Sequence, residues 1–105
     1  MATGEASKRR LIVNADDFGR SGSINASVIQ AHREGILTTA SLMVNEPSCD
    51  EAVQLAKANP GLGVGLHLSL LCGRAGLSPD QIPGLVDEAP GASRARTTTR
   101  LWIWD

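Results

Sequence analysis

This 105-residue sequence has only two cysteines, no long apolar run and almost no net charge. Its two cysteines, Cys49 and Cys72, are too few and too isolated for a disulfide framework or a paired-cysteine metal clip, so we expect free thiols. No apolar segment approaches the roughly 18 residues that a membrane span needs. The net charge of -1 favours no polyanionic partner, and we expect neither nucleic acid nor a membrane span.

Signals for secretion and for serine-dependent hydrolysis are also missing. Residues 1–7 are polar and lack the apolar stretch of a secretory signal, so the expected location is cytoplasmic. The basic run Lys8-Arg9-Arg10 precedes an apolar segment and is interpreted as a solvated approach to a strand. No Gly-x-Ser-x-Gly motif is present, which leaves a serine hydrolase without support. With 42% hydrophobic and 20% charged residues, the chain is expected to form one soluble domain with a modest core.

Three segments rich in apolar and β-branched residues are the expected strands. The first starts at Leu11 and ends in two carboxylates and a glycine, the second spans residues 36–44, and the third spans residues 62–70. Their starts lie about 25 residues apart, which predicts a β-α-β-α-β series with parallel strands and right-handed crossovers. In the third segment, leucine and valine alternate with glycine, histidine and serine, which is typical of a barrel wall with its large residues against outer helices.

Two helices are expected between these strands. Ser21 or Ser23 can cap the first helix, and Gly35 ends it. Ser48 can cap the second, which stops at residues 59–61. The expected fold class is therefore α/β, the N-terminal β-α-β-α-β portion of a (β/α) barrel, incomplete because three strands cannot close a barrel.

Three residues at the strand ends carry the expected chemistry. Asp16 and Asp17 end the first strand, and His67 lies near the end of the third. Because the carboxyl ends of parallel strands share one rim, we expect these side chains to meet there. A carboxylate and an imidazole can hold a divalent cation while the second carboxylate accepts a proton. The structural alternative is that Asp16 or Asp17 caps the turn at Gly19 and that His67 is a hydrogen-bonded core residue.

Other polar residues are weaker candidates. His32 lies near the end of the first expected helix, where a cationic side chain suits the dipole, and is interpreted as structural or surface. Asn14 and Asn45 are candidates for hydrogen bonds to a substrate or for turn chemistry. The glycines of residues 61–65 alternate along a strand and do not open a helix, so we reject a dinucleotide loop.

Several motifs resemble the YdjC-like carbohydrate deacetylases. The matching segments are Leu11 to Gly19, Ala31 to Thr38, Ala40 to Asn45 and Leu62 to Leu68. The resemblance covers about residues 9 to 88, with the motifs in the right order. This family includes chitooligosaccharide deacetylases and a hopanoid-biosynthesis-associated branch, toward which residues 85–87 lean. The resemblance implies a distorted (β/α) barrel of the glycoside hydrolase/deacetylase type. It also implies hydrolysis of an N-acetyl group with a divalent cation such as Mg²⁺ or Zn²⁺.

The same resemblance assigns roles to individual residues. Asp17 resembles the family's metal-binding aspartate, His67 its first metal-binding histidine, and Asp16 the carboxylate proposed as general base, although adjacent carboxylates can exchange roles. The expected substrate is an N-acetylated sugar, oligosaccharide or glycolipid. The family also uses a second histidine ligand, which this sequence ends before reaching. A non-catalytic remnant or sugar-binding fragment is therefore the alternative function, and a phosphate-ester hydrolase is a more distant one.

The composition changes near the end of the chain. Residues 91–100 contain three arginines and no acid, and both tryptophans lie within residues 101–105. We expect residues 1–88 to form the barrel portion and residues 89–105 to form an irregular tail. We interpret that tail as a frame-shifted or artificial end, with an interaction segment as the alternative. Because three strands leave the sheet edges open, oligomerisation through those edges is expected.

Overall fold

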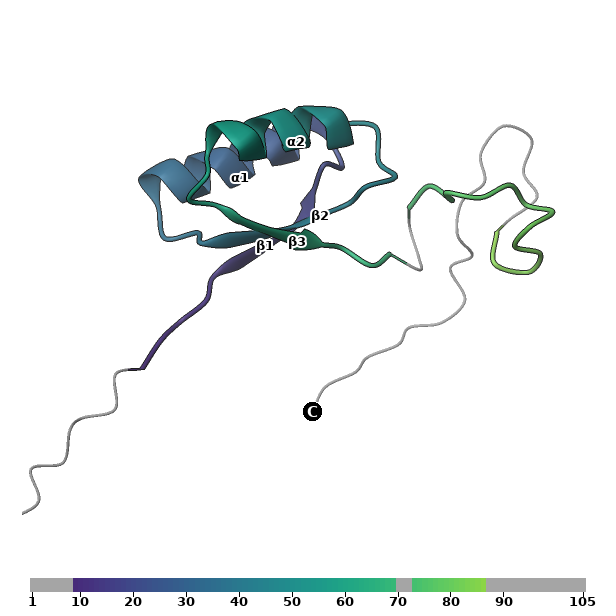
Figure 1. Cartoon of the computed structure of the whole chain (residues 1–105), viewed down its shortest axis with the longest axis horizontal. Helices are drawn as coiled ribbons and strands as arrows, with labels where there is room; N and C mark the ends of the chain where they lie inside the picture. Colours follow the sequence, from purple (N-terminus) through teal and green to yellow (C-terminus); the bar gives the residue numbers. More distant parts are fainter. Residues whose placement is uncertain (1–8, 70–72, 87–105) are drawn as a thin grey trace, which may run out of the picture.

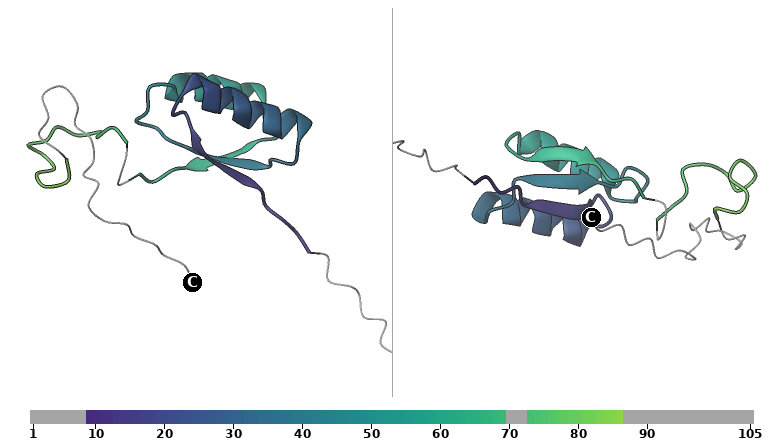
Figure 2. Two further views of the ribbon diagram at one scale, coloured as in Figure 1. Left: turned by 180° about the vertical axis from the view of Figure 1, so that it is seen from behind. Right: turned by 90° about the horizontal axis from the view of Figure 1, so that it is seen from below.

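A computed structural model describes residues 9–69 and 73–86 of the chain. Its elements are β1 (Asn14–Phe18), α1 (Gly22–Glu34), β2 (Thr39–Leu42), α2 (Cys49–Ala58) and β3 (Gly63–Leu66). The strands form one parallel sheet in the order β1-β2-β3. Both helices lie on the same face of this sheet (Figure 1), and the strands run side by side in front of the helices when seen from below (Figure 2). The predicted parallel β-α-β-α-β arrangement is therefore confirmed.

The helices begin and end where the local sequence predicts. Ser21 is the N-cap of α1, with its hydroxyl accepting a hydrogen bond from the Ile24 N–H at 3.3 Å, and Gly35 is the C-cap. Ser48 occupies the N-cap position of α2 without a capping hydrogen bond from its side chain, and Asn59 ends that helix. Ser21 therefore caps its helix through its side chain. Ser48 lies at the predicted start of α2 but does not cap it with its side chain.

The strands are shorter than predicted. β1 starts at Asn14, so the prediction that the first strand starts at Leu11 is wrong, and Leu11 and Ile12 are 79% and 75% exposed. The second and third strands are likewise limited to Thr39–Leu42 and Gly63–Leu66. The parallel ladders begin at Asn14 opposite Thr39 and at Thr39 opposite Gly63, so Leu11 and Ile12 precede the paired part of β1.

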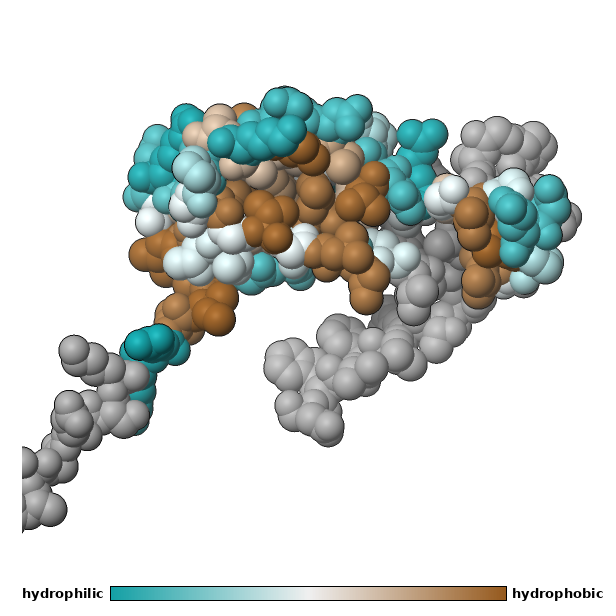
Figure 3. Space-filling model, in the orientation of Figure 1, coloured by the Kyte–Doolittle hydropathy of each residue, from teal (hydrophilic) through white to brown (hydrophobic). Residues whose placement is uncertain are grey.

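The core lies between the sheet and the helices. Its buried members are Phe18, Val28, Ile29, Leu37, Ala40, Ala52 and Leu62. The pairing of Ala40 with Val64 places the large residues of β3 on the helix-facing side of the sheet, as predicted. The helices do not cover them, however, because Val64 is 42% and Leu66 is 61% exposed. Figure 3 shows apolar surface on this side of the molecule, below the helices.

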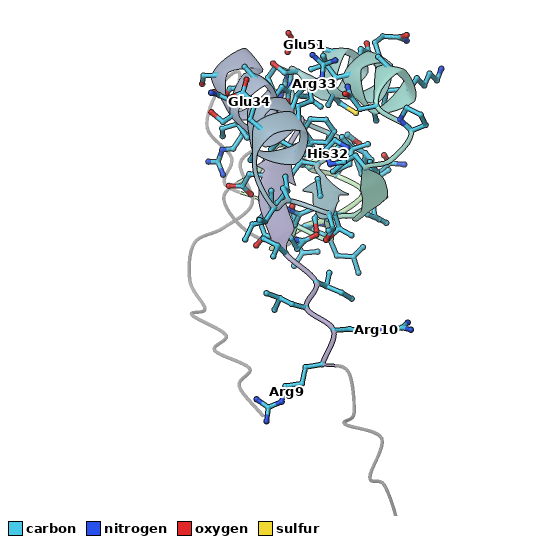
Figure 4. All side chains as sticks on the ribbon, turned by 90° about the vertical axis from the view of Figure 1, so that its left-hand side faces the viewer. Arg9, Arg10, His32, Arg33, Glu34 and Glu51 are labelled. Carbon is cyan, nitrogen blue, oxygen red and sulfur yellow. The ribbon has the colours of Figure 1, made fainter. Side chains whose placement is uncertain are left out.

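The residues before β1 and after β3 lie outside the sheet and its two helices, and the structure describes part of them. Arg9 and Arg10 are exposed and extend away from the helices and sheet (Figure 4), which agrees with a solvated approach to β1. Cys49 is a free thiol. The predicted tail of residues 89–105 and Cys72 lie outside the described residues. Among the residues that are described, no helix has the length and apolar character to cross a membrane.

Candidate metal and carboxylate site

The backbone of β1 becomes irregular where its two carboxylates occur. Ala15 pairs with Ala40 and Phe18 pairs with Leu42, so two residues of β1 face a single residue of β2 and the ladder register shifts. Asp17 adopts a left-handed backbone conformation with φ of 64°. At a bulge, neighbouring side chains need not point to opposite faces of the sheet. Two consecutive carboxylates can therefore both lie at the carboxyl end of a strand.

Asp17 and His67 meet at the carboxyl end of the sheet. The Asp17 Oδ1 and His67 Nδ1 atoms are 3.6 Å apart, and the Asp17 backbone N–H donates to the same Nδ1 atom at 3.3 Å. His67 follows β3 directly and is held by its own N–H, which donates to the Leu42 carbonyl at 2.9 Å. The two side chains are 39% and 25% exposed, so a ligand can reach them from solvent. The structure therefore brings this predicted pair together.

Arg20 is a partner of Asp17 that the sequence analysis missed. Its Nη1 atom lies 3.6 Å from Asp17 Oδ2, while the other carboxylate oxygen is directed toward His67. Both charged groups are substantially exposed, so this pair is a weak, solvent-screened contact. The sequence signal that could have identified it is the spacing of three residues across a turn. In the structure the Arg20 N–H closes that turn by donating to the Asp17 carbonyl at 3.0 Å.

Asp16 belongs to a different set of contacts. Its Oδ1 atom accepts a hydrogen bond from Asn14 Nδ2 at 3.0 Å, and the same amide donates to Ser41 Oγ at 3.1 Å. Thr39 Oγ1 completes this row by donating to Asn14 Oδ1 at 2.8 Å. Within the described residues, Asp16 has no hydrogen bond or ion pair with Asp17 or His67. The structure thus joins Asp16 to Asn14 and not to the Asp17–His67 pair.

The Asp17–His67 pair suits a divalent cation in atom type and spacing. A carboxylate oxygen and an imidazole nitrogen are ordinary ligands of Zn²⁺, and two ligands of one tetrahedral ion lie about 3.4 Å apart. The observed separation of 3.6 Å is close to that value. Nevertheless, no group of three or more His, Cys, Asp or Glu side chains in the described part of the chain is arranged to hold a metal ion. The pair therefore fits as a portion of a cation site that needs further ligands.

The amide of Asn25 is the second residue that the sequence analysis missed. Asn25 is completely buried in α1, and its Oδ1 atom accepts a hydrogen bond from the Gly19 N–H at 2.7 Å. Its Nδ2 group donates to the Ser48 carbonyl at 3.0 Å and to Glu51 Oε2 at 2.8 Å. An asparagine on the face of a helix next to apolar residues gives no clear sequence signal, because its partners lie on other elements.

The weaker candidates divide into structural and surface residues. His32 points from α1 toward the sheet (Figure 4), and its Nδ1 atom lies 2.9 Å from the Leu37 carbonyl, which supports the structural interpretation. Asn45 is exposed and lies beside Gly76 on a loop after β2. Asn14 is part of the polar row described above, with its side chain occupied by protein partners.

The parallel α/β fold agrees with the family that the sequence motifs suggested. The family profile described as "YdjC-like protein" matches residues 10–98, which is most of the chain. The chain therefore belongs to the YdjC-like family. The resemblance identified from the motifs is confirmed.

Two curated relatives illustrate the match. The carbohydrate deacetylase of Brevibacillus brevis is 54% identical over 78 residues, a region that covers 74% of this chain and 31% of the relative. The chitooligosaccharide deacetylase of Salmonella paratyphi B is 39% identical over 97 residues, covering 92% of this chain and 34% of the relative. The chain thus spans about a third of the length of the relatives that it matches.

A solved structure shows the same architecture. A protein from Enterococcus faecalis V583, named for cellobiose-phosphate cleavage, superimposes with a TM-score of 0.75 and 34% sequence identity. The superposition covers 86% of this chain and 35% of that protein. The predicted fold class, a β-α-β-α-β portion of a (β/α) barrel, is confirmed.

Proposed function

We propose that this chain supplies part of the active site of a metal-dependent carbohydrate deacetylase. The reaction would be hydrolysis of the N-acetyl group of an amino sugar, oligosaccharide or glycolipid. The single observation that carries this proposal is the 3.6 Å approach of Asp17 to His67 at the carboxyl end of a parallel sheet. The names of the relatives, carbohydrate deacetylase and chitooligosaccharide deacetylase, support the choice of substrate class.

Each residue would have a distinct task. Asp17 and His67 would hold Mg²⁺ or Zn²⁺, which when bound polarises the acetamide carbonyl and makes a water more acidic. Asp16 would accept the proton of the attacking water as general base. Asn14 orients that carboxylate, because its amide donates to Asp16 Oδ1 at 3.0 Å and is itself held by Ser41 and Thr39. His67 must release the Asp17 N–H from its Nδ1 lone pair if that nitrogen is to bind the cation.

Acetate release from an N-acetylated chitooligosaccharide tests the proposed activity. The 105-residue chain would be assayed with Mg²⁺ and with Zn²⁺, alongside Asp16→Asn, which keeps the size of the side chain and removes its basicity. Asp80→Asn is the matched control, because Asp80 is an exposed carboxylate on a loop outside the helices and sheet. If the chain is a deacetylase, Asp16→Asn should lower acetate release at least about a hundredfold, the scale of general base catalysis, and Asp80→Asn should preserve it.

The alternative function is a non-catalytic remnant or sugar-binding fragment. It is motivated by the two-ligand site, because no third His, Cys, Asp or Glu side chain of the described residues joins Asp17 and His67 in an arrangement that could hold a metal ion. Sugar binding without acetate release would favour it over the deacetylase. Phosphate release from a sugar phosphate, in place of acetate, would instead favour an ester hydrolase at the same rim. A hopanoid-related glycolipid substrate, which rests on residues 85–87 of the sequence, and a cytoplasmic location belong to the same proposal.

A further inference from the structure

We propose that Asn25 is a positioning residue for the candidate site, fixing the backbone turn that presents Asp17 to His67. This inference rests on the proposed function, because the site that Asn25 would position is the proposed metal site. Its geometry comes from the hydrogen bonds of the structure. Asn25 touches neither Asp17 nor His67. Its influence would pass through Gly19, two residues after Asp17.

The turn after β1 is held from several directions. The Gly19 N–H donates to Asn25 Oδ1 at 2.7 Å, and the Gly19 carbonyl accepts from the Ser48 N–H at 3.0 Å. Phe18, between Asp17 and Gly19, is completely buried, and its carbonyl accepts from the Met43 N–H at 2.7 Å. Asp17, with its left-handed backbone, therefore precedes two residues whose positions are fixed by other elements.

The Asn25 amide is the point at which three segments meet. It accepts from the turn after β1 and donates to the Ser48 carbonyl and to Glu51, both at the start of α2. Glu51 lies between the two helices in Figure 4. The Asn25 side chain is completely buried and makes all three of these hydrogen bonds. A buried amide whose donors and acceptor are all bonded fixes the positions of the groups around it. Leucine or alanine at this position would leave the Gly19 N–H without its acceptor.

Gly19 shows why the turn has little freedom to compensate. Its φ of 96° suits glycine, and an added Cβ atom would lie 3.1 Å from both the Leu42 side chain and the Met43 carbonyl. The turn is thus packed against β2 and the loop that follows it. If the Asn25 hydrogen bond were lost, the Gly19 peptide would reorient, and the backbone N–H of Asp17, which contacts His67 Nδ1 at 3.3 Å, would move with it.

Asn59 provides a matched control for this inference. It is the other buried polar residue of the described part of the chain, at 7% exposure, and it also uses its amide to join the helices. Its Nδ2 group donates to the Leu55 carbonyl at 2.7 Å, and its Oδ1 atom accepts from Arg33 Nε at 2.8 Å. Asn59 ends α2 at the opposite end of that helix from Ser48, and so lies away from the candidate site.

The test compares Asn25→Ala with Asn59→Ala in the full chain by ¹H–¹⁵N nuclear magnetic resonance and by Zn²⁺ titration. Both variants should lose stability, because each removes a buried amide and leaves partners unsatisfied. Only Asn25→Ala should shift the Asp17 and Gly19 amide resonances and the His67 ring resonances. Zn²⁺ affinity should fall about tenfold in Asn25→Ala, as for other residues that orient metal ligands, and should be unchanged in Asn59→Ala.

The outcomes separate this inference from the proposed function. Unchanged Asp17 and His67 resonances in Asn25→Ala, or equal shifts in Asn59→Ala, would overturn the positioning role. Absence of Zn²⁺ binding by the unmodified chain would count against the metal site, while the resonances would still decide the role of Asn25. If Asn25→Ala does not fold, Glu51→Ala removes one acceptor of the Asn25 amide from an exposed position. That variant should shift the Gly19 amide resonance, and no shift would overturn the inference.

Discussion

Asp17 combines an unusual backbone with two polar neighbours, His67 and Arg20. Its φ of 64° places it in the left-handed region, which non-glycine residues adopt infrequently. One carboxylate oxygen is directed to His67 and the other to Arg20. Strained conformations of this kind persist where the surroundings impose them, and they are enriched at functional sites. The conformation follows from the bulge that lets β1 end in two consecutive carboxylates.

Gly19→Ala tests whether this turn is as tightly constrained as its contacts indicate. The added methyl group would meet the Leu42 side chain and the Met43 carbonyl at 3.1 Å, at a positive φ. We expect the free energy of unfolding to fall by about 1–3 kcal/mol, measured by urea denaturation. Gly65→Ala is the control, because a Cβ atom there meets nothing within 4 Å of the described structure. Equal losses in both variants would show that the turn is not specially constrained.

The pairing of Asp17 with His67 could be predicted from the sequence, whereas the network around it could not. Parallel strands place their carboxyl ends on one rim, so two polar residues at those ends are expected to be neighbours. The contact between Asn25 and Gly19 depends on how α1 packs against α2, and no local pattern encodes that packing. Asp16 was expected at the same point as Asp17, but it contacts Asn14 instead, two residues earlier on the same face of β1.

The two helices offer a direct test of capping at the level of secondary structure. Ser21 caps α1 with a hydroxyl that accepts from the Ile24 N–H, whereas Ser48 begins α2 without such a bond. Ser21→Ala should therefore lower the free energy of unfolding by about 1 kcal/mol, and Ser48→Ala should change it by less than half as much. Chemical denaturation monitored by circular dichroism measures both. A larger loss in Ser48→Ala than in Ser21→Ala would contradict the assignment of the caps.

The order and type of the elements followed from the sequence, but the strand lengths did not. A capping serine at position 21 or 23 and the glycine at position 35 were sufficient to place α1. Leu11 and Ile12 have strong strand propensity, yet they lie outside the ladder because β2 begins pairing only at Thr39. Strand length depends on the neighbouring strand, and this information is not local in the sequence.

At the scale of the whole molecule, the exposed apolar side chains predict association. Val64, Leu66 and Leu68 are 42%, 61% and 82% exposed on and after β3, and the edges of β1 and β3 have no partner strand within the described residues. Between β1 and α1 there is also an open groove of about 400 Å³ lined by Ala15, Ile24 and Val28, among others. Analytical ultracentrifugation of the 105-residue chain should therefore show concentration-dependent oligomers.

Charge substitution tests the source of that association. Leu66→Lys combined with Leu68→Lys should shift the chain toward the monomer, because like charges at a sheet edge oppose edge-to-edge pairing. Leu77→Lys is the control, since Leu77 is also exposed, at 54%, but lies outside the sheet. A monomeric unmodified chain that melts in one sharp, cooperative transition would contradict the prediction.

The most direct test of the central claim is a Zn²⁺ titration of the full chain by isothermal calorimetry. It would compare the unmodified protein with Asp17→Ala and His67→Ala, and with His32→Ala as the control, because His32 contacts the Leu37 carbonyl away from the candidate site. We expect binding by the unmodified chain and by His32→Ala, and at least a tenfold loss of affinity in each of the other two variants. Equal affinity in all four proteins would show that Asp17 and His67 do not form the metal site.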